Sequence, residues 1–261
     1  MWTIGMAAAV VLSAGIGLSL GLVGGGGSIV TVPILVYVAG LTPREAVALS
    51  LPIVGATAAA AALLQYRAGN TDLRAASLFA ITGMVGAVLG APLTGLLPGP
   101  ALMLIFAALM LAVGARMLRV RTEEEPQSAG ECSPLRCGIV GLGVGVLTGF
   151  LGVGGGFLIV PALLRFARLP MRKAVGTSLL IIAANSASGF LAHLGEIGRH
   201  GPMAVAFTAS ALVGMVAGTV LGRRMHPAGL KAAFAGLALA VAAYLVVMNA
   251  RPVLDLLSHS G

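Results

Sequence analysis

Charge is what this sequence has least of. Only 16 of its 261 residues are Lys or Arg, and only 8 are Asp or Glu. The charges are also unevenly placed, because long stretches carry none at all, among them residues 1–43, 46–66, 75–115 and 138–164. A transmembrane helix needs about 20 consecutive apolar residues. These stretches therefore predict an all-α polytopic membrane protein with no separate soluble domain.

The scarcity of acidic residues also narrows the function. No Asp, Glu, Lys or Arg falls inside a predicted span, whereas proton and cation pathways are marked by ionisable groups within the membrane. A cation or metal carrier of the inner membrane is therefore the alternative rather than the first choice. The spans also lack a GxSG serine motif and paired aspartates, so no intramembrane enzyme is predicted. Without a P-loop, no nucleotide is expected, and neither a cofactor nor a metal ion.

Cysteine is almost absent, and the basic residues have an ordinary explanation. Cys132 and Cys137 lie in or beside a polar linker without the spacing of a metal site, and we interpret them as plain thiols. The net charge of +8 comes from Arg and Lys in short loops between apolar segments, as membrane orientation requires. No nucleic-acid partner is predicted.

What the chain has in abundance is glycine, arranged in a duplicated pattern. Residues 21–53 and 149–181 align at a shift of 128, with 15 of 33 positions identical. The sequence divides into repeat 1 at 1–119, an acidic linker at 120–133, repeat 2 at 134–250 and a short tail at 251–261. Each repeat has a long glycine-interrupted segment and then three apolar segments. Glycines four apart, such as Gly86 and Gly90, predict seams where helices approach closely.

The long first segment is too long for one crossing. Its 43 uncharged residues would form a helix of about 65 Å, twice the hydrocarbon core. If each long segment crosses once, the 16 basic residues divide eight against eight; if each returns to its starting side, they divide thirteen against three. The second division follows the positive-inside rule. It predicts two inverted repeats, each a Gly-broken hairpin plus three transmembrane helices, with the linker cytoplasmic and both termini periplasmic. The hairpin arms could be full crossings or re-entrant half-helices.

The two glycine runs are the predicted substrate site. A helix begins after each run, and its first amide groups carry the positive end of the dipole without intrahelical partners. Such an end favours anions, and glycine lets the backbone approach a small ligand. In inverted repeats two such tips would meet near the midplane, a transporter architecture. The candidate tip residues are Gly24, Gly26, Gly27, Ser28, Gly152, Gly154, Gly155 and Gly156.

Few other polar side chains lie within the spans. Ser50 and Ser178 are repeat-equivalent candidates, and Thr177 lies beside the second of them. Asn185, which is opposite Thr57 in the repeat alignment, either lines the pathway or forms a hydrogen bond between helices. Gln65 and His193 lie near segment ends, and we expect them at the membrane interface.

The paired strings identify a likeness to a known family. "GLVGGGGSIVTVP" and "GFLGVGGGFLIVP", followed by "REAVALSL" and "RKAVGTSL", resemble the sulfite exporter TauE/SafE family of membrane permeases. The resemblance implies a multi-pass protein of a bacterial inner membrane that transports small sulfur-containing anions such as sulfite, sulfoacetate or related organosulfonates. The lipid bilayer and the anion are then the expected partners, and a homodimer stays open. Repeat 1 departs from the pattern with "ALSLP" where repeat 2 has "GTSLL", so the half-sites need not contribute equally.

Overall fold

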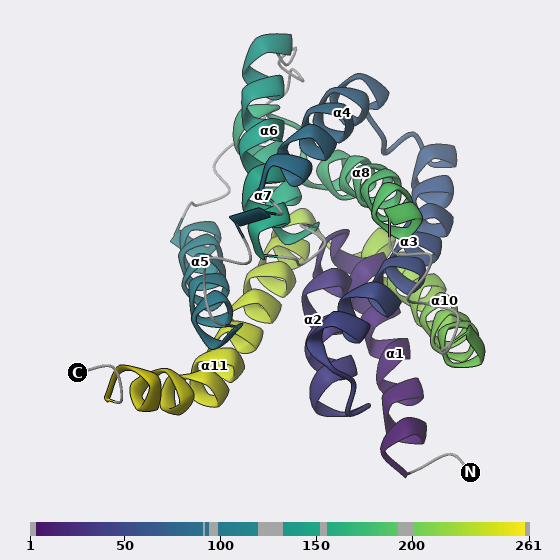
Figure 1. The fold of residues 1–261 in the computed structure, drawn as a ribbon. Helices are drawn as coiled ribbons and strands as arrows, with labels where there is room; N and C mark the ends of the chain where they lie inside the picture. The colour runs from purple at the N-terminus through teal and green to yellow at the C-terminus, as the bar shows by residue number, and fades with distance from the viewer. Residues whose placement is uncertain are drawn as a thin grey trace.

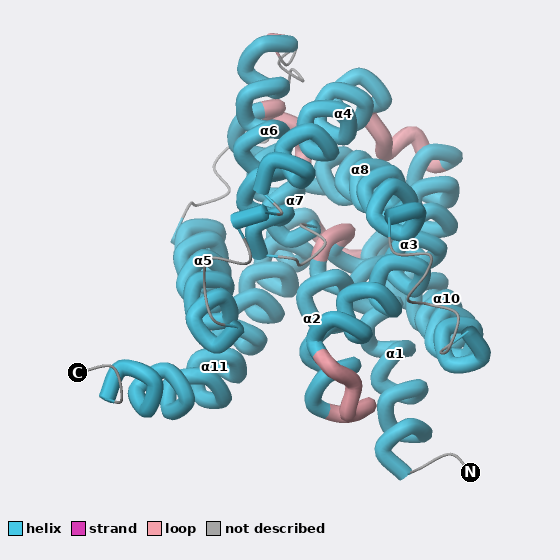
Figure 2. Tube along the Cα trace, viewed as in Figure 1, coloured by secondary structure: helices cyan, strands magenta, loops and turns pink. Residues whose placement is uncertain are grey.

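The computed structural model describes residues 4–90, 92–93, 99–119, 133–151, 156–192 and 201–258, and the regular structure within them is helical (Figures 1 and 2). Repeat 1 contains α1 (Ile4–Val23), α2 (Gly26–Tyr37), α3 (Pro43–Arg67), α4 (Leu73–Gly90) and α5 (Gly99–Arg119). Repeat 2 contains α6 (Pro134–Leu151), α7 (Gly156–Phe166), α8 (Met171–Ala192), α10 (Gly201–Arg224) and α11 (Pro227–Ser258). The prediction of an all-helical polytopic membrane protein is confirmed.

Two of the described helices, α2 and α7, are much shorter than the others. Five described helices are long and apolar enough to cross a membrane. By contrast, α2 has 12 residues and α7 has 11, which corresponds to about 18 and 16 Å against a hydrocarbon core of about 30 Å. Neither short helix spans a bilayer. Of the two forms left open for the hairpin arms, these lengths fit the re-entrant one.

The first long segment does fold back on itself. The start of α2 lies against the second half of α1: a Cβ at Gly27 would meet Leu20 and the carbonyl of Ile16, and one at Gly26 would approach Ser19. Val10, near the other end of α1, packs with Val32 and Leu35 of α2 in a separate hydrophobic cluster. These contacts define an antiparallel hairpin with its turn at Gly24 and Gly25, as the sequence predicts.

The equivalent helices α3 and α8 run in opposite directions where they meet. Along their contact, Leu51 faces Gly189, Gly55 faces Ser186, and Gln65 faces Gly176. The numbers rise on one helix as they fall on the other, so the pair is antiparallel. Because α3 and α8 are repeat-equivalent, this contact agrees with inverted repeats. The inverted arrangement of the whole repeats and their orientation in a bilayer stay predictions.

The remaining close packing occurs between repeats along glycine seams. Between α1 and α10, a Cβ at Gly17 would overlap the carbonyl of Ala211, and one at Gly218 would overlap that of Leu18. The equivalent pair, α4 with α6, repeats the pattern: a Cβ at Gly145 would overlap Gly83, and one at Gly86 would overlap Leu142. Backbone meets backbone in both pairs, as expected for small-residue helix interfaces.

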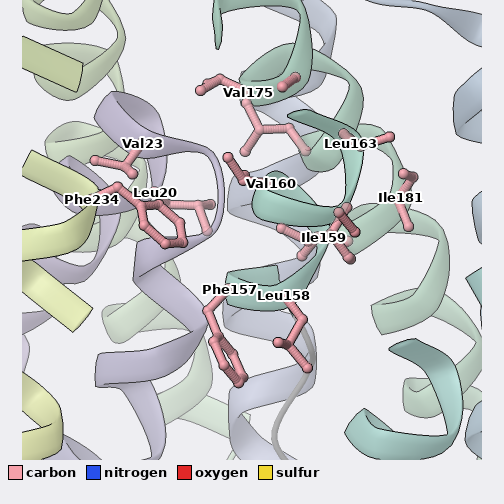
Figure 3. Close-up of a cluster of buried hydrophobic side chains, with 14 of the residues drawn as sticks. Leu20, Val23, Phe157, Leu158, Ile159, Val160, Leu163, Val175, Ile181 and Phe234 are labelled. Carbon is pink, nitrogen blue, oxygen red and sulfur yellow. The ribbon is translucent and has the colours of Figure 1, made fainter. Parts of the chain in front are cut away.

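The largest core cluster lies where the two short helices meet the long ones. Leu20 and Val23 from α1 pack with Phe157 and Val160 from α7, and with Val175 from α8 (Figure 3). Phe106 of α5 stacks edge-on against Phe157, with ring centroids 5.1 Å apart. The turn between α1 and α2 is therefore enclosed by apolar side chains of both repeats.

Two details differ from the sequence interpretation. Cys137 is fully buried and disulfide-bonded, so the expectation of two plain thiols is wrong; the other cysteine, Cys132, and the linker lie outside the described residues. In addition, α11 continues through Arg251 to Ser258, so most of the segment predicted as a tail extends the last helix.

The seams generate a stability prediction. Gly17→Ala and Gly145→Ala should each destabilise the fold by about 1–3 kcal/mol, because a methyl group would force two backbones apart. The matched changes Gly143→Ala and Gly236→Ala meet no atom within 4 Å and should be neutral or stabilising by up to about 1 kcal/mol, since alanine is the better helix former. Thermal unfolding in detergent compares the four. Equal losses in both pairs would contradict the assignment of the seams.

Candidate functional site

The turn between α1 and α2 is a break in the backbone inside the protein. Gly24 has φ of +75°, a conformation that glycine adopts without steric cost, and its N–H donates to the carbonyl of Leu20 at 2.8 Å. Gly25 is the N-cap residue of α2, and no side chain caps this helix. The first amides of α2, at Gly26 and Gly27, therefore start a helix with its positive dipole end in a buried turn. We call Gly24–Gly27 tip 1.

Ser178 fixes the position of tip 1. Its Oγ donates to the carbonyl of Gly24 at 3.1 Å and to that of Val175, in its own helix, at 2.8 Å. A Cβ at Gly24 would lie 2.8 Å from this Oγ and 2.9 Å from the Cα of Val175. Glycine at this position is thus required by both the backbone angle and the space. The Ser178 hydroxyl, a predicted ligand for the anion, here holds the turn.

The two tips meet. A Cβ at Gly25 would overlap the carbonyl oxygen of Gly156 and lie 3.3 Å from the nitrogen of Phe157, so the turn of repeat 1 touches the first residues of α7. Gly25 and Gly156 are both buried. The prediction that glycine segments of both repeats come together therefore agrees with this contact. In this conformation their backbones touch directly.

Part of the predicted site cannot be placed. Gly152, Gly154 and Gly155 lie outside the described residues, as does the side chain of Ser28. Their roles stay predictions. Only Gly156, the first residue of α7, represents the second glycine run in the contact with tip 1.

The other candidates are dispersed. Thr177 is fully buried and its Oγ1 accepts the backbone N–H of Asp72 at 2.9 Å, so it holds the start of α4 rather than a tip. Asn185 lies two turns beyond Ser178 on α8, about 10 Å along the axis, and its buried Oδ1 has no hydrogen-bond partner. Ser50 is buried on α3.

Sequence reasoning missed the polar α3–α4 connection. Gln65, expected at the interface, is 7 % exposed, and its Oε1 accepts from Nδ2 of Asn70 at 3.1 Å. Asp72 Oδ1 accepts the N–H of Ala75, which caps α4 in the usual manner of a helix N-terminus. The available signal was the short "GNTD" turn after a span, but its place beside α8 depends on the antiparallel contact between repeats.

Comparison with known proteins agrees with this architecture. The family model of the sulfite exporter TauE/SafE matches residues 8–245, which includes both glycine runs and all ten described helices in whole or in part. The chain belongs to the TauE/SafE sulfite exporter family. It is therefore a multi-pass membrane protein of a transporter family.

Individual relatives carry names of the same kind. A "Probable membrane transporter protein" of Xylella fastidiosa strain Temecula1 is 36% identical over 242 residues, covering 88% of this chain and 91% of the relative. The "Probable membrane transporter protein YunE" of Bacillus subtilis strain 168 is 29% identical, covering 78% and 84% respectively. YdhB of the same organism, with the same description, is 26% identical over 80% and 85%. No solved structure matches this TauE/SafE chain.

The geometry of tip 1 gives a prediction with two internal controls. Gly40 and Gly69 share the positive φ of Gly24, at 72° and 73°, but have no atom within 4 Å of a Cβ. Gly40→Ala and Gly69→Ala should therefore cost only the backbone strain, about 1–2 kcal/mol. Gly24→Ala should cost about 1–3 kcal/mol more, because Val175 and Ser178 must also move. Thermal unfolding of the three variants measures this, and equal losses would show that tip 1 is loosely packed.

Proposed function

We propose that this TauE/SafE protein is a secondary transporter or facilitator that exports small anions, sulfite or an organosulfonate, across a bacterial inner membrane. The observation that carries the proposal is the contact between Gly25 and Gly156, which brings backbone segments of both repeats together in the protein interior. Non-helical backbone at membrane depth is tolerated where it is buried in protein or lines a pathway. In transporters built from inverted repeats, such broken helices form the substrate site.

The chemistry of the tips favours an anion. The start of α2 is uncapped by any side chain and presents amide donors and a positive dipole end. Among the described residues, no group of three or more His, Cys, Asp or Glu could hold a metal ion. Among these residues the alternative, a cation or metal carrier, therefore has no such cluster to support it.

The contact between Gly25 and Gly156 bears on how an anion could bind. The two backbones lie too close for an ion to fit between these two residues. Binding at this contact would therefore require the starts of α2 and α7 to move apart.

The positions of the basic residues support the proposed topology. Arg172 Nη2 donates to the carbonyl of Met225 at 3.1 Å, and Arg223 Nη2 donates to that of Leu64 at 2.9 Å. The ends of α3 and α10 and the starts of α4, α8 and α11 are thereby gathered at one end of the molecule. We call it the basic end; it contains Arg67, Arg74, Arg172, Lys173, Arg223, Arg224 and Lys231. By the positive-inside rule it faces the cytoplasm.

One observation points the other way. The disulfide at Cys137 is the kind of bond that persists in oxidising compartments, whereas the proposed topology places the preceding linker in the cytoplasm. A direct measurement of sidedness is therefore the first experiment.

Single cysteines at positions 44 and 172, in a background without Cys132 and Cys137, test the topology. The two positions are repeat-equivalent, yet position 44 begins α3 and position 172 begins the antiparallel α8. An impermeant thiol reagent added to intact cells should label position 44 and not position 172. Labelling of both positions alike would refute the inverted arrangement, and labelling of 172 alone would reverse the orientation.

Flux in proteoliposomes tests the function. Sulfite, sulfoacetate, sulfate, thiosulfate and acetate would be compared under a potential set by potassium and valinomycin. With no intramembrane carboxylate to carry a coupled ion, we expect the potential to drive the anion toward the positive side. One charge across 100 mV is worth about 2.3 kcal/mol, which corresponds to a concentration ratio of about 40. Flux that ignores the potential and follows a pH gradient would indicate proton coupling instead.

A pair of glycine variants connects flux to the tips. Gly26→Leu should abolish transport, because its side chain would fill the uncapped start of α2 against Leu237 and Ser19. Gly236→Leu makes the same chemical change on α11, where a Cβ meets no atom within 4 Å, and should transport normally. Both proteins are first compared by expression and thermal stability. Full flux in Gly26→Leu would remove the tip from the proposed site.

A further inference from the structure

A pocket opens at the basic end, beside tip 1. It is lined by residues from the ends of five helices and from the α3–α4 connection: Leu22, Gln65, Asn70, Arg172, Val175, Gly222, Arg223 and Leu230. Most of its space lies at a mouth open to solvent. The lining includes two arginines and two amide side chains but no carboxylate. Its charge is therefore suited to an anion.

Both arginines are held in place without being neutralised. Each guanidinium uses one nitrogen to bond a backbone carbonyl, Arg172 that of Met225 and Arg223 that of Leu64. A guanidinium has five N–H donors in a planar fork, so donors remain on each side chain. Asp72, the acidic residue of the adjoining connection, uses Oδ1 to accept the N–H of Ala75. Both arginines are exposed and keep N–H donors that are free of these two bonds.

The pocket lies next to tip 1. Val175 lines the pocket, and its Cα lies 2.9 Å from where a Cβ of Gly24 would be. Leu22, which also lines the pocket, is two residues before Gly24 in the chain. Two lining residues thus connect the pocket to the glycine turn. As it stands, the enclosed part of the pocket has room for about one water molecule, so a larger ion enters only if the arginine side chains move.

In the repeat alignment the two arginines of the pocket have one arginine and one alanine as counterparts. At the shift of 128, Arg172 corresponds to Arg44; at the shift of 132 that applies later in the repeats, Arg223 corresponds to Ala91. Leu22 corresponds to Phe150. The pair of arginines is therefore specific to repeat 2, as a loading site on one side of the protein would require.

We propose that the pocket between Arg172 and Arg223 is a loading site, where a small oxyanion is collected before it reaches tip 1. The inference rests on the proposed function and deepens it. The planar forks of two arginines match the oxygens of a sulfonate or sulfite group, and the amides of Gln65 and Asn70, bonded to one another at 3.1 Å, supply neutral polar contacts beside them.

Equilibrium binding of sulfoacetate to the purified protein tests the loading site. A sulfonate is used because sulfite also attacks disulfides. Arg172→Gln and Arg223→Gln should each weaken binding about tenfold, the loss expected for one charge-assisted hydrogen bond on a partly exposed group. Arg223→Lys keeps the charge but loses the fork and should weaken binding about threefold. Arg224→Gln, an exposed neighbour that does not line the pocket, should bind normally.

A sidedness measurement separates loading from general destabilisation. In vesicles of known orientation, Arg223→Gln should raise the half-saturating sulfoacetate concentration about tenfold when the anion is offered at the basic end, and leave it unchanged from the other side. The measurements are made at zero potential, where a passive carrier has the same ratio of maximal rate to half-saturating concentration in both directions. The ratio of the two maximal rates should therefore shift by the same factor as the half-saturating concentration. Unequal effects from the two sides cannot come from a weakened fold, because both measurements use the same protein.

The outcomes distinguish this inference from the proposed function. Unchanged affinity in both glutamine variants, with normal anion flux in the original chain, would overturn the loading site and leave the transporter proposal standing. Binding that depends on both arginines, without flux of any tested anion, would support the pocket and refute transport. A chain that neither binds nor transports any of these anions would refute both.

Discussion

The constraint on which this structure depends is the need to bury a broken backbone in an apolar environment. At Gly24 and Gly25 the chain leaves the helical path and reverses, which exposes amide and carbonyl groups that a lipid cannot satisfy. The protein accommodates them with its own groups: Leu20 and Ser178 bond the two sides of Gly24, and Gly156 covers Gly25. Because Ser178 and Gly156 come from repeat 2, the described hairpin of repeat 1 is not complete by itself.

The same requirement explains why glycine governs the packing around the tips. Helices inside a membrane gain nothing from excluding water, so they associate by close packing and backbone approach. The seams of α1 with α10 and of α4 with α6 place glycine where any side chain would overlap a carbonyl. The pair of α1 with α10 and the pair of α4 with α6 are formed by equivalent interfaces, which agrees with the seam glycines that the two repeats share at equivalent positions.

The two halves nevertheless differ where chemistry is concerned. Thr177 accepts the N–H of Asp72, whereas its repeat equivalent, Leu49, has no hydroxyl with which to do so. Arg223 has Ala91 as its equivalent. Equivalent positions of the two repeats therefore carry different hydrogen-bonding groups and different charges. Net movement of an anion still requires a gradient or a potential, but the affinities on the two sides need not be equal.

The sequence by itself determined the elements of this protein and the relation between its repeats. Uncharged runs separated by arginines require membrane helices, the 128-residue shift requires two equivalent halves, and 43 uncharged residues cannot form one straight span; each follows from local composition and helix geometry. The glycine seams could also be predicted from local sequence, because a four-residue spacing places glycines on one face of a helix. No local sequence pattern, however, predicts which helices pack against one another. Tertiary packing decides that α1 packs on α10, and that Ser178 bonds Gly24 while Thr177 bonds Asp72. It also brings Arg172 and Arg223, which are 51 positions apart in the sequence, to one pocket. In this packing the antiparallel crossing of α3 and α8 decides which helix ends meet.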